Sequence, residues 1–242
     1  MLRFGEHRGK LAEPVAANRL LTAAGPAERA RLAPYLDEVT IDRDAVLIDE
    51  DEPSRAVWFP QDALFSTIAT TQEGHRIEVG LAGFDGAVGL DLLLGGVSYT
   101  TVVAQIAGTA LRMDARHFAR HVVEHGGPLH ALLLRYTNAF IGCVTQIAAC
   151  NAAHAVDLRL ARWLAMARDR TGRSTLPLTH EAVAMVIGVR RASVTLVAGR
   201  LREARAIDYV RGEIRIVDSA RLEREACDCY PVIRARAEAV FA

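Results

Sequence analysis

An apolar stripe at helical spacing runs for more than 20 residues after Pro128, and it limits the possible folds more than any other feature. A helix of that length extends for roughly 30 Å, and this one carries few charges besides Arg135. The stripe consists of Leu129, Leu132, Leu133, Tyr136, Phe140, Cys143, Val144 and Ile147.

Such a helix has more apolar surface than a small neighbouring domain can cover. We therefore predict that it pairs with its copy in a second chain, which gives a homodimer. The alternative is a helix that is buried entirely within its own domain. The predicted dimer interface consists of Leu129, Leu133, Tyr136, Phe140, Val144 and Ile147.

Between Val39 and Met113 the pattern changes to short apolar runs that are separated by turn residues. The turns contain acidic residues, glycine and proline, as in Asp49–Pro53 and Gly83–Gly86. Short strands at such regular spacing predict a compact antiparallel barrel or roll. The predicted strands are Ala45–Ile48, Ala56–Phe59, Leu64–Ala69, Ile77–Leu81, Thr101–Ile106 and Thr109–Met113.

Helical patterns flank these strands on both sides. Residues 18–36 predict short helices, and a further helix is predicted between Val156 and Ala167, with a stop at Thr171–Ser174. The fold class is therefore α+β. We predict a sensor-like β-roll domain over residues 1–127, a dimerisation helix over 128–152 and a C-terminal domain over 153–242. The arginines predicted to point outward from the further helix are Arg159, Arg162, Arg168 and Arg170.

Residues 176–217 predict a winged helix-turn-helix. Thr179 can cap a short helix, and Gly188 gives a tight turn after it. A second helix begins near Arg190, and two short strands follow it, joined by Arg211-Gly212. The order of two helices and a hairpin is that of a DNA-reading head.

The residue types at the start of the second helix suit base reading. A recognition helix enters the major groove with its N-terminal residues, and arginine can bond guanine through two hydrogen bonds. Arg191, Ser193 and Thr195 are predicted to read bases, while Arg190 and Arg211 are better placed for phosphates. Thr179 completes the predicted DNA-binding set.

The net charge differs between the N-terminal and C-terminal parts of the chain. The 29 basic and 29 acidic residues cancel over the whole chain. Residues 154–217, however, contain 12 arginines and 6 acidic residues, which gives +6. Residues 1–153 contain 13 basic and 18 acidic residues, which gives −5. The positive part is the part that contains the predicted DNA-reading head.

These motifs resemble the Crp/Fnr family of bacterial transcription regulators. The resemblance rests on Leu178–Glu181, on Gly188–Thr195, on the Tyr209-x-Arg211-Gly212 wing and on the Asp157–Leu164 segment. The order of roll, long helix and winged helix extends it over about residues 18–225. It implies that the roll resembles a cyclic-nucleotide-binding domain, that a homodimer binds an imperfect palindrome of double-stranded DNA, and that the protein contacts RNA polymerase.

The equivalent of the family's cyclic-nucleotide turn is Gly89–Thr101, and it departs from the family pattern. Leu90 occupies the position of the glutamate, and the arginine that holds the phosphate is missing. No lysine or arginine occurs between Arg76 and Arg112, so nothing in this turn would neutralise a phosphate. We predict no binding of cyclic AMP or cyclic GMP. The effector is unknown, and the alternatives are an apolar ligand, a redox signal or constitutive activity.

No metal or cofactor site is predicted. An N-terminal cysteine cluster of the kind that holds an iron–sulfur centre is missing. His117, His121 and His125 could align on a helix, but they are better explained as a solvated helix end. Cys227 and Cys229 alone do not complete a zinc site. Cys143 and Cys150 are predicted to be small interface residues, with a redox-sensitive thiol between subunits as the alternative.

An enzyme is the main rival class. A barrel-type metalloenzyme or small-ligand barrel protein would need histidines clustered among the strands, yet His75 is the only histidine between residues 39 and 113. We therefore predict a regulator without catalytic residues. The cysteine pattern, the N-terminal residues without an apolar stretch and the lack of a ~20-residue apolar span favour the cytoplasm and argue against a membrane partner.

Overall fold

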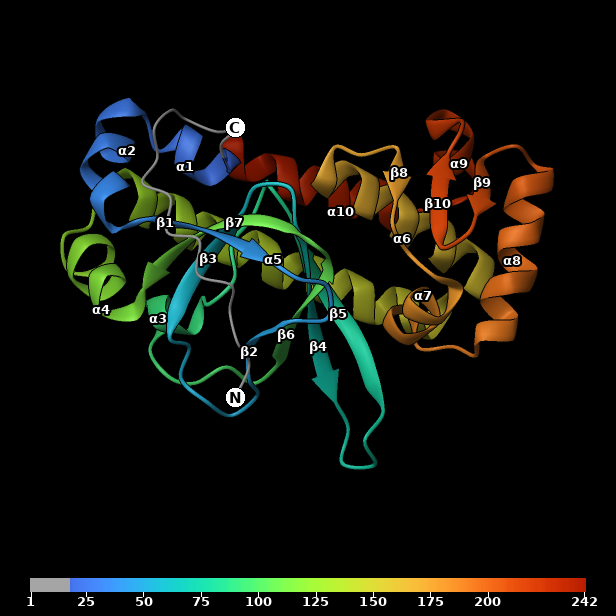
Figure 1. Ribbon diagram of the computed structural model, residues 1–242, viewed down its shortest axis with the longest axis horizontal. Coiled ribbons are helices and arrows are strands. Elements are labelled where there is room, and N and C mark those ends of the chain that lie inside the picture. Colours follow the sequence, from blue (N-terminus) through green and yellow to red (C-terminus); the bar gives the residue numbers. More distant parts are fainter. Residues whose placement is uncertain (1–17) are drawn as a thin grey trace.

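The computed structural model describes residues 18–242. Figure 1 shows a β-sheet part and a mainly helical C-terminal part, with the long helix α5 (Pro128–Ala153) running along both. The class is α+β, as predicted, with an antiparallel roll, a long helix and a winged helix-turn-helix in this order.

Two antiparallel sheets form the roll, with strand orders β1-β7-β3 and β2-β6-β4-β5. All six predicted strands are present, and their ends agree to within one residue. β1 was not among them. The strands are β1 (Asp37–Ile41), β2 (Val46–Ile48), β3 (Ala56–Pro60), β4 (Leu64–Thr70), β5 (Arg76–Ala82), β6 (Thr101–Ile106) and β7 (Gly108–Asp114).

Helices surround the roll and make up most of the C-terminal part. Those of the N-terminal part are α1 (Arg19–Ala23), α2 (Pro26–Leu32), the 3-10 turn Ala33–Tyr35, α3 (Asp91–Leu94), α4 (Ala115–Phe118) and the π turn Ala119–Val123. After α5 come α6 (Val156–Thr171), β8 (Thr175–Leu176), α7 (His180–Ile187), α8 (Arg191–Glu203), β9 (Ile207–Val210), β10 (Glu213–Ile216), α9 (Ser219–Glu225), α10 (Cys229–Glu238) and the 3-10 turn Ala239–Phe241.

The stripe of α5 that we predicted to pair between two chains packs inside its own chain. Leu129 and Leu133 are fully buried in a cluster with the N-terminal helices and strands of the roll. Ile147 is buried in a second cluster, which it shares with α6. Tyr136 is also buried, and Phe140 and Val144 are half-buried. Leu129, Leu133, Tyr136 and Ile147 therefore serve the contact between α5 and its own chain, which leaves them no surface for a partner. The predicted pairing through Phe140 and Val144 stays a prediction.

The other side of α5 carries a second stripe, which is exposed. Its members are spaced alternately three and four residues apart, which is a heptad pattern. The largest of them, Leu134 and Ile141, have 46% and 56% of their surface exposed. The exposed stripe consists of Ala131, Leu134, Asn138, Ile141, Thr145, Ala148 and Ala152. Two faces of one helix are thus available for two different contacts.

Helix α6 has no exposed residue along its whole length. Two of the arginines that we predicted to point outward are buried, since Arg162 is 2% and Arg170 is 6% exposed. The Nε of Arg170 donates to the carbonyl of Leu81 at 3.2 Å, and its own carbonyl accepts from the amide of Phe84 at 3.1 Å. The roll therefore covers the face of α6 that would have met solvent in an isolated C-terminal domain.

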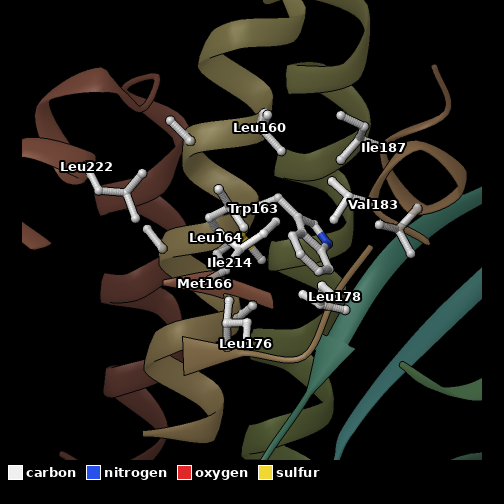
Figure 2. Packing of buried hydrophobic residues seen from close by; sticks show 14 of the residues in the cluster. Leu160, Trp163, Leu164, Met166, Leu176, Leu178, Val183, Ile187, Ile214 and Leu222 are labelled. Carbon is white, nitrogen blue, oxygen red and sulfur yellow. The ribbon is translucent and has the colours of Figure 1, made fainter. Parts of the chain in front are cut away.

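One apolar cluster joins the C-terminal part to the roll. Figure 2 shows Trp163 of α6 among Leu160, Leu178 and Val183. The same cluster includes Leu81 of β5. The division of the chain near residue 153 stays a prediction, because this core runs across it.

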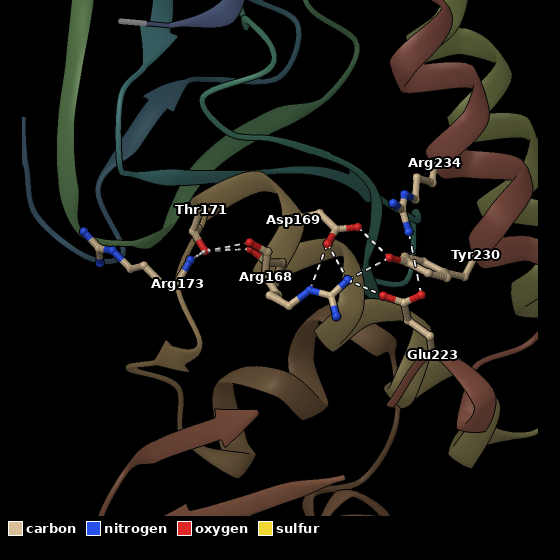
Figure 3. A network of polar contacts seen from close by, with 8 residues as sticks. Arg168, Asp169, Thr171, Arg173, Glu223, Tyr230 and Arg234 are labelled. Atoms are coloured by element: carbon tan, nitrogen blue, oxygen red, sulfur yellow. Dashed lines mark hydrogen bonds and ion pairs between the residues drawn. The ribbon is translucent and has the colours of Figure 1, made fainter. Parts of the chain in front are cut away.

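A polar network fixes the two C-terminal helices to α6. The Nη2 of Arg168 donates to Asp169, to Glu223 of α9 at 2.7 Å and to the hydroxyl of Tyr230 at 2.9 Å. The Tyr230 hydroxyl donates in turn to Asp169 at 2.6 Å. Figure 3 shows how these groups converge from three helices. Every partner in the network is a charged or hydroxyl group, so the bonds are of the stronger, charge-assisted kind.

A buried carboxyl group lies at the contact between the roll and α6. Glu78 of β5 is 4% exposed and accepts hydrogen bonds from Ser66 Oγ at 2.6 Å and Trp163 Nε1 at 2.7 Å. Burial raises the pKa of Glu78 to about 7 because the carboxylate loses its hydration, and the two hydrogen bonds and the charges of Arg162 and Arg170 oppose this shift only in part. The folded protein therefore binds a proton more tightly at Glu78 than the unfolded chain does.

This difference predicts a pH-dependent stability. Below pH 4.5 Glu78 is protonated in both states, and as the pH rises to about 7 the unfolded chain releases the proton first. The contribution of Glu78 to the free energy of unfolding should fall over this window by about 3 kcal/mol. In Glu78→Gln this loss should vanish, so urea unfolding should show the variant gaining on the wild type between pH 4.5 and about 7. Glu73→Gln, at an exposed turn, is the control, and parallel curves for Glu78→Gln and the wild type would contradict the prediction.

Candidate DNA-binding surface

Helices α7 and α8 form a helix-turn-helix. Their axes differ in direction by 108°, which is typical of the motif. Val183 and Ile187 of α7 and Val194, Val197 and Leu201 of α8 are buried in the core that surrounds α6. The apolar sides of both helices are thus used inside the domain, and the opposite side of α8 is left at the surface.

Two local signals place these helices, and both were predicted. The Oγ1 of Thr179 accepts a hydrogen bond from the amide of Ala182 at 3.1 Å and so caps α7. Gly188 ends α7 in the left-handed conformation, with φ of 66°. The amide of Val189 then donates to the carbonyl of Ala184 at 3.0 Å, which turns the chain toward α8.

The wing is a three-stranded antiparallel sheet of order β8-β10-β9. Arg211 and Gly212 connect β9 and β10 with φ of 46° and 87°, a pair of values that suits a two-residue hairpin. Arg211 is exposed at the tip. The wing therefore presents a basic residue beside the helix-turn-helix.

The structure brings the predicted DNA-binding residues to one part of the surface. Arg190, Arg191, Thr195 and Arg211 are exposed, and Ser193 and Thr179 are half-buried. Arg190 precedes the first residue of α8, and Arg191 begins it. Thr195 lies one turn further along α8. Its hydroxyl donates to the carbonyl of Arg191 at 3.2 Å, so it is partly engaged within the helix.

The charges of these arginines are largely free. Within residues 18–242 neither Arg190 nor Arg211 has an ion-pair partner, and the Nε of Arg191 is 3.9 Å from Glu181, which is itself exposed. Further along α8, Arg202 pairs with Asp208 at 3.1 Å and Arg200 with Asp157 at 4.0 Å. Within α8 itself, the arginine charge at the N-terminal end is therefore freer than that of Arg200 and Arg202.

His180 is part of this surface, and sequence reasoning gave it no role. Its ring stacks on Tyr209 of the wing with 4.1 Å between the centroids, and its Nδ1 lies 3.0 Å from the hydroxyl of Thr195. Burial and the nearby charge of Arg191 lower its pKa, which favours the neutral ring. His180 thus ties α7, α8 and the wing together. The signal was present in the Leu178–Glu181 motif, but the contact depends on how the wing folds back.

A cavity of about 290 Å³ lies between the roll and α5. The segment Gly89–Thr100 lines it together with Thr137, Phe140 and Ile141 of α5. The charged side chain in the lining is Asp91, whose carboxylate accepts hydrogen bonds from the amide and the hydroxyl of Ser54 at 2.9 and 2.6 Å. No lysine or arginine lines the cavity in the part of the chain that the structure describes. The cavity therefore suits an uncharged, mainly apolar occupant.

Two of the three histidines, His117 and His121, lie near Tyr35. His121 stacks on Tyr35 at 3.9 Å, and in residues 18–242 the side chains of His117, His121 and His125 are not among the ligand groups that converge. His75, the histidine of the strand region, is exposed on the turn between β4 and β5.

Comparison with known proteins agrees with this geometry. Residues 158–225 match the family model of the Crp-like helix-turn-helix domain. The C-terminal part of the chain therefore contains a Crp-like helix-turn-helix domain. No curated protein is significantly similar to the sequence.

Solved structures of regulators extend the likeness in fold from the C-terminal domain to most of the chain. A transcriptional regulator of the CRP family from Thermus thermophilus has 20% identity and a TM-score of 0.62, and the match covers 77% of this chain and 95% of that one. FixK2 from Bradyrhizobium japonicum has 14% identity and a TM-score of 0.65, with 79% and 98% covered. The c-di-GMP responsive regulator CLP from Xanthomonas campestris has 12% identity and a TM-score of 0.62, with 79% and 99% covered.

Among residues 18–242 no single helix is long and apolar enough to cross a membrane, and one bent pair passes by length and composition alone. That pair is α7 with α8, which is the Crp-like helix-turn-helix itself.

The turn of the helix-turn-helix can be tested with two glycines. Gly188→Ala should lower the free energy of unfolding by about 1–2 kcal/mol, because an L-residue is strained at its φ of 66°. Gly199→Ala, within α8, should raise it by about 0.5–1 kcal/mol, because a Cβ there meets nothing within 4 Å and alanine favours the helix. Urea unfolding of both variants measures these changes. Equal effects at the two positions would show that the turn does not hold Gly188 in this conformation.

Proposed function

We propose that this Crp/Fnr-type chain is a homodimeric transcription regulator that reads a palindromic DNA site through α8. The observation that carries the proposal is the group of exposed arginines, Arg190, Arg191 and Arg211, at the start of α8 and on the wing of a domain that matches the Crp-like family model. A recognition helix enters the major groove N-terminus first, and this is the end of α8 that is exposed and basic.

The arginines take different roles in this proposal. Arg191, with Ser193 and Thr195, reads base edges, since arginine can bond guanine bidentately and a threonine methyl can contact thymine. Arg190 and Arg211 bind phosphates, which fixes the head on the duplex without reading sequence. Thr179 supports this surface by capping α7, and His180 supports it by contacting α8 and the wing.

The homodimer is proposed to form through the exposed stripe of α5. Its heptad spacing suits a two-helix seam, and its alanines permit close approach of the helices. Asn138, at a seam position, would favour one register. Two copies then present two heads, as a palindromic site requires. Contact with RNA polymerase, a location in the cytoplasm and the absence of catalysis belong to the same proposal.

The cavity beside α5 favours a second proposal, which is that an uncharged ligand controls DNA binding. A cyclic nucleotide would place a phosphate where no basic side chain lines the wall. Ile141 belongs both to this cavity and to the exposed stripe, so an occupant would touch the proposed seam. Native mass spectrometry of the purified protein tests for such a ligand, and micromolar binding of cyclic AMP in calorimetry would exclude this interpretation.

DNA reading can be tested once genomic footprinting with the intact protein has given the operator. Arg191→Ala should weaken operator binding by about 1–3 kcal/mol and relax the preference at one base pair in each half-site. Arg211→Ala should weaken binding to all sequences alike and reduce the salt slope by ~1 per chain. Arg116→Ala, which removes an exposed arginine of the roll, is the control. Uniform binding by the wild type that does not depend on salt would refute the proposal.

The seam can be tested separately. Leu134→Asp combined with Ile141→Asp should convert the dimer into a monomer, because two like charges would face each other at each position. Sedimentation velocity measures the mass, and operator affinity should fall with it. Val217→Asp introduces the same charge at an exposed apolar residue outside α5 and should leave the dimer intact. A double variant that stays dimeric would place the interface elsewhere.

A further inference from the structure

Three cysteines and one histidine meet where α5 ends. Cys150 lies in the last turn of α5 and His154 follows its last residue. Cys227 lies in the connection between α9 and α10, and Cys229 begins α10. The Sγ atoms of Cys150 and Cys227 are 3.4 Å apart, and the Sγ of Cys229 is 3.6 Å from the Nδ1 of His154. All four ligand atoms lie within 4.8 Å of one another.

These distances are close to those of a tetrahedral metal site. Zinc binds sulfur at about 2.3 Å and imidazole nitrogen at about 2.0 Å, so its four ligands stand roughly 3.5–3.8 Å apart. The two shortest separations of the cluster therefore need only small side-chain adjustments. The three cysteines are buried and His154 is half-buried, as suits a closed structural site and not an open catalytic one.

We propose that Cys150, His154, Cys227 and Cys229 bind one zinc ion. Three thiolates and one imidazole are a common ligand set of structural zinc sites, and soft sulfur ligands in tetrahedral arrangement favour zinc over hard cations. Each cysteine binds as the thiolate and releases its proton on binding. The sequence did not reveal the site, because Cys227-x-Cys229 offers two ligands and the other two lie more than 70 residues upstream.

The groups around the cluster orient the ring of His154 and stabilise a thiolate. The Nε2 of His154 lies 3.4 Å from a carboxylate oxygen of Asp228, which leaves Nδ1 to face the thiols. A carboxylate behind a ligating histidine is the usual arrangement that fixes the tautomer. The amide of Gln146 donates to the Sγ of Cys229 at 3.2 Å, a bond that would stabilise a thiolate.

The charge balance also favours the metal. Zinc with three thiolates and a neutral imidazole carries a net charge of −1. Arg162 is 2% exposed, and the Nε atoms of both Arg159 and Arg162 are buried without a hydrogen-bond partner in the described part of the chain. Both arginines are near enough to Cys150 for their charges to act on it. A negative cluster beside these two arginines would compensate part of their buried positive charge.

The proposed site would join the junction of α5 and α6 to the C-terminal helix. His154 lies between the two helices, and Cys227 and Cys229 belong to the segment that leads from α9 into α10. A bound zinc would hold these segments together. An effect of zinc on DNA binding would depend on the proposed function, but the binding of zinc itself does not depend on it.

The test is the metal content of the reduced and dialysed protein, measured by inductively coupled plasma mass spectrometry. Wild type should contain one zinc per chain, and Cys227→Ser and Cys229→Ser should lose it. Cys143→Ser is the matched control, since Cys143 is also a buried cysteine of α5 but contacts the carbonyl of Ile233 instead, and it should keep the zinc. Because the serine variants can fail to fold, wild type is also stripped with a chelator and titrated with Co²⁺. The absorption bands of tetrahedral cobalt with sulfur ligands should appear and saturate at one equivalent.

Several results would overturn the proposal. They are a wild-type protein that takes up neither zinc nor cobalt when reduced, a zinc content unchanged in both serine variants, iron in place of zinc, and a Cys150–Cys227 disulfide in a protein that binds no metal after reduction. Loss of operator binding with the zinc content intact would count against the proposed function and leave the zinc site standing.

Discussion

The packing of α6 against the roll, the reading head and the C-terminal helices is the constraint on which the rest of the structure depends. Four arginines and two aspartates lie on this helix, none of them fully exposed, so the buried charged groups need partners in the elements that cover them. The roll satisfies Arg170 through the carbonyl of Leu81, and α9 and α10 satisfy Arg168 through Glu223 and Tyr230. The reading head packs on the remaining apolar side. α6 thus determines how the roll, the helices α9 and α10 and the DNA-reading head are arranged.

This arrangement has consequences for regulation. If the head moved away from the roll together with α6, it would separate Trp163 from Glu78, to which the indole donates. Such a contact is costly to break, because a buried carboxyl group would lose its partner. A regulatory movement in a protein of this design must therefore either carry α6 along with the roll or exchange these contacts for others of similar free energy.

The parts that sequence predicted well are those that local signals determine. The strands follow from short apolar runs and the turns between them, and the helix-turn-helix follows from the Thr179 cap, the Gly188 turn and the Arg211-Gly212 hairpin. The faces of α5 and α6 could not be predicted in this way, because periodicity identifies a stripe but not what covers it. Leu133 was therefore assigned to a partner chain and Arg162 to solvent. The contacts of His180 and of the cysteine cluster join residues that are distant in sequence, and no spacing rule reveals them.

Helix α5 is the element through which the proposed sites can influence one another. Within one turn Phe140 faces the roll, where it leaves no room for a Cβ at Gly80, and Ile141 faces outward on the exposed stripe. Both residues line the cavity, so an occupant touches the roll contact and the proposed seam together. Three turns further along, the helix ends at the cysteine cluster and at the junction with α6. A ligand changes the position of the heads only if it binds two arrangements of this helix with different affinity. Because the roll side is tightly packed, the exposed side is where two arrangements can differ at least cost.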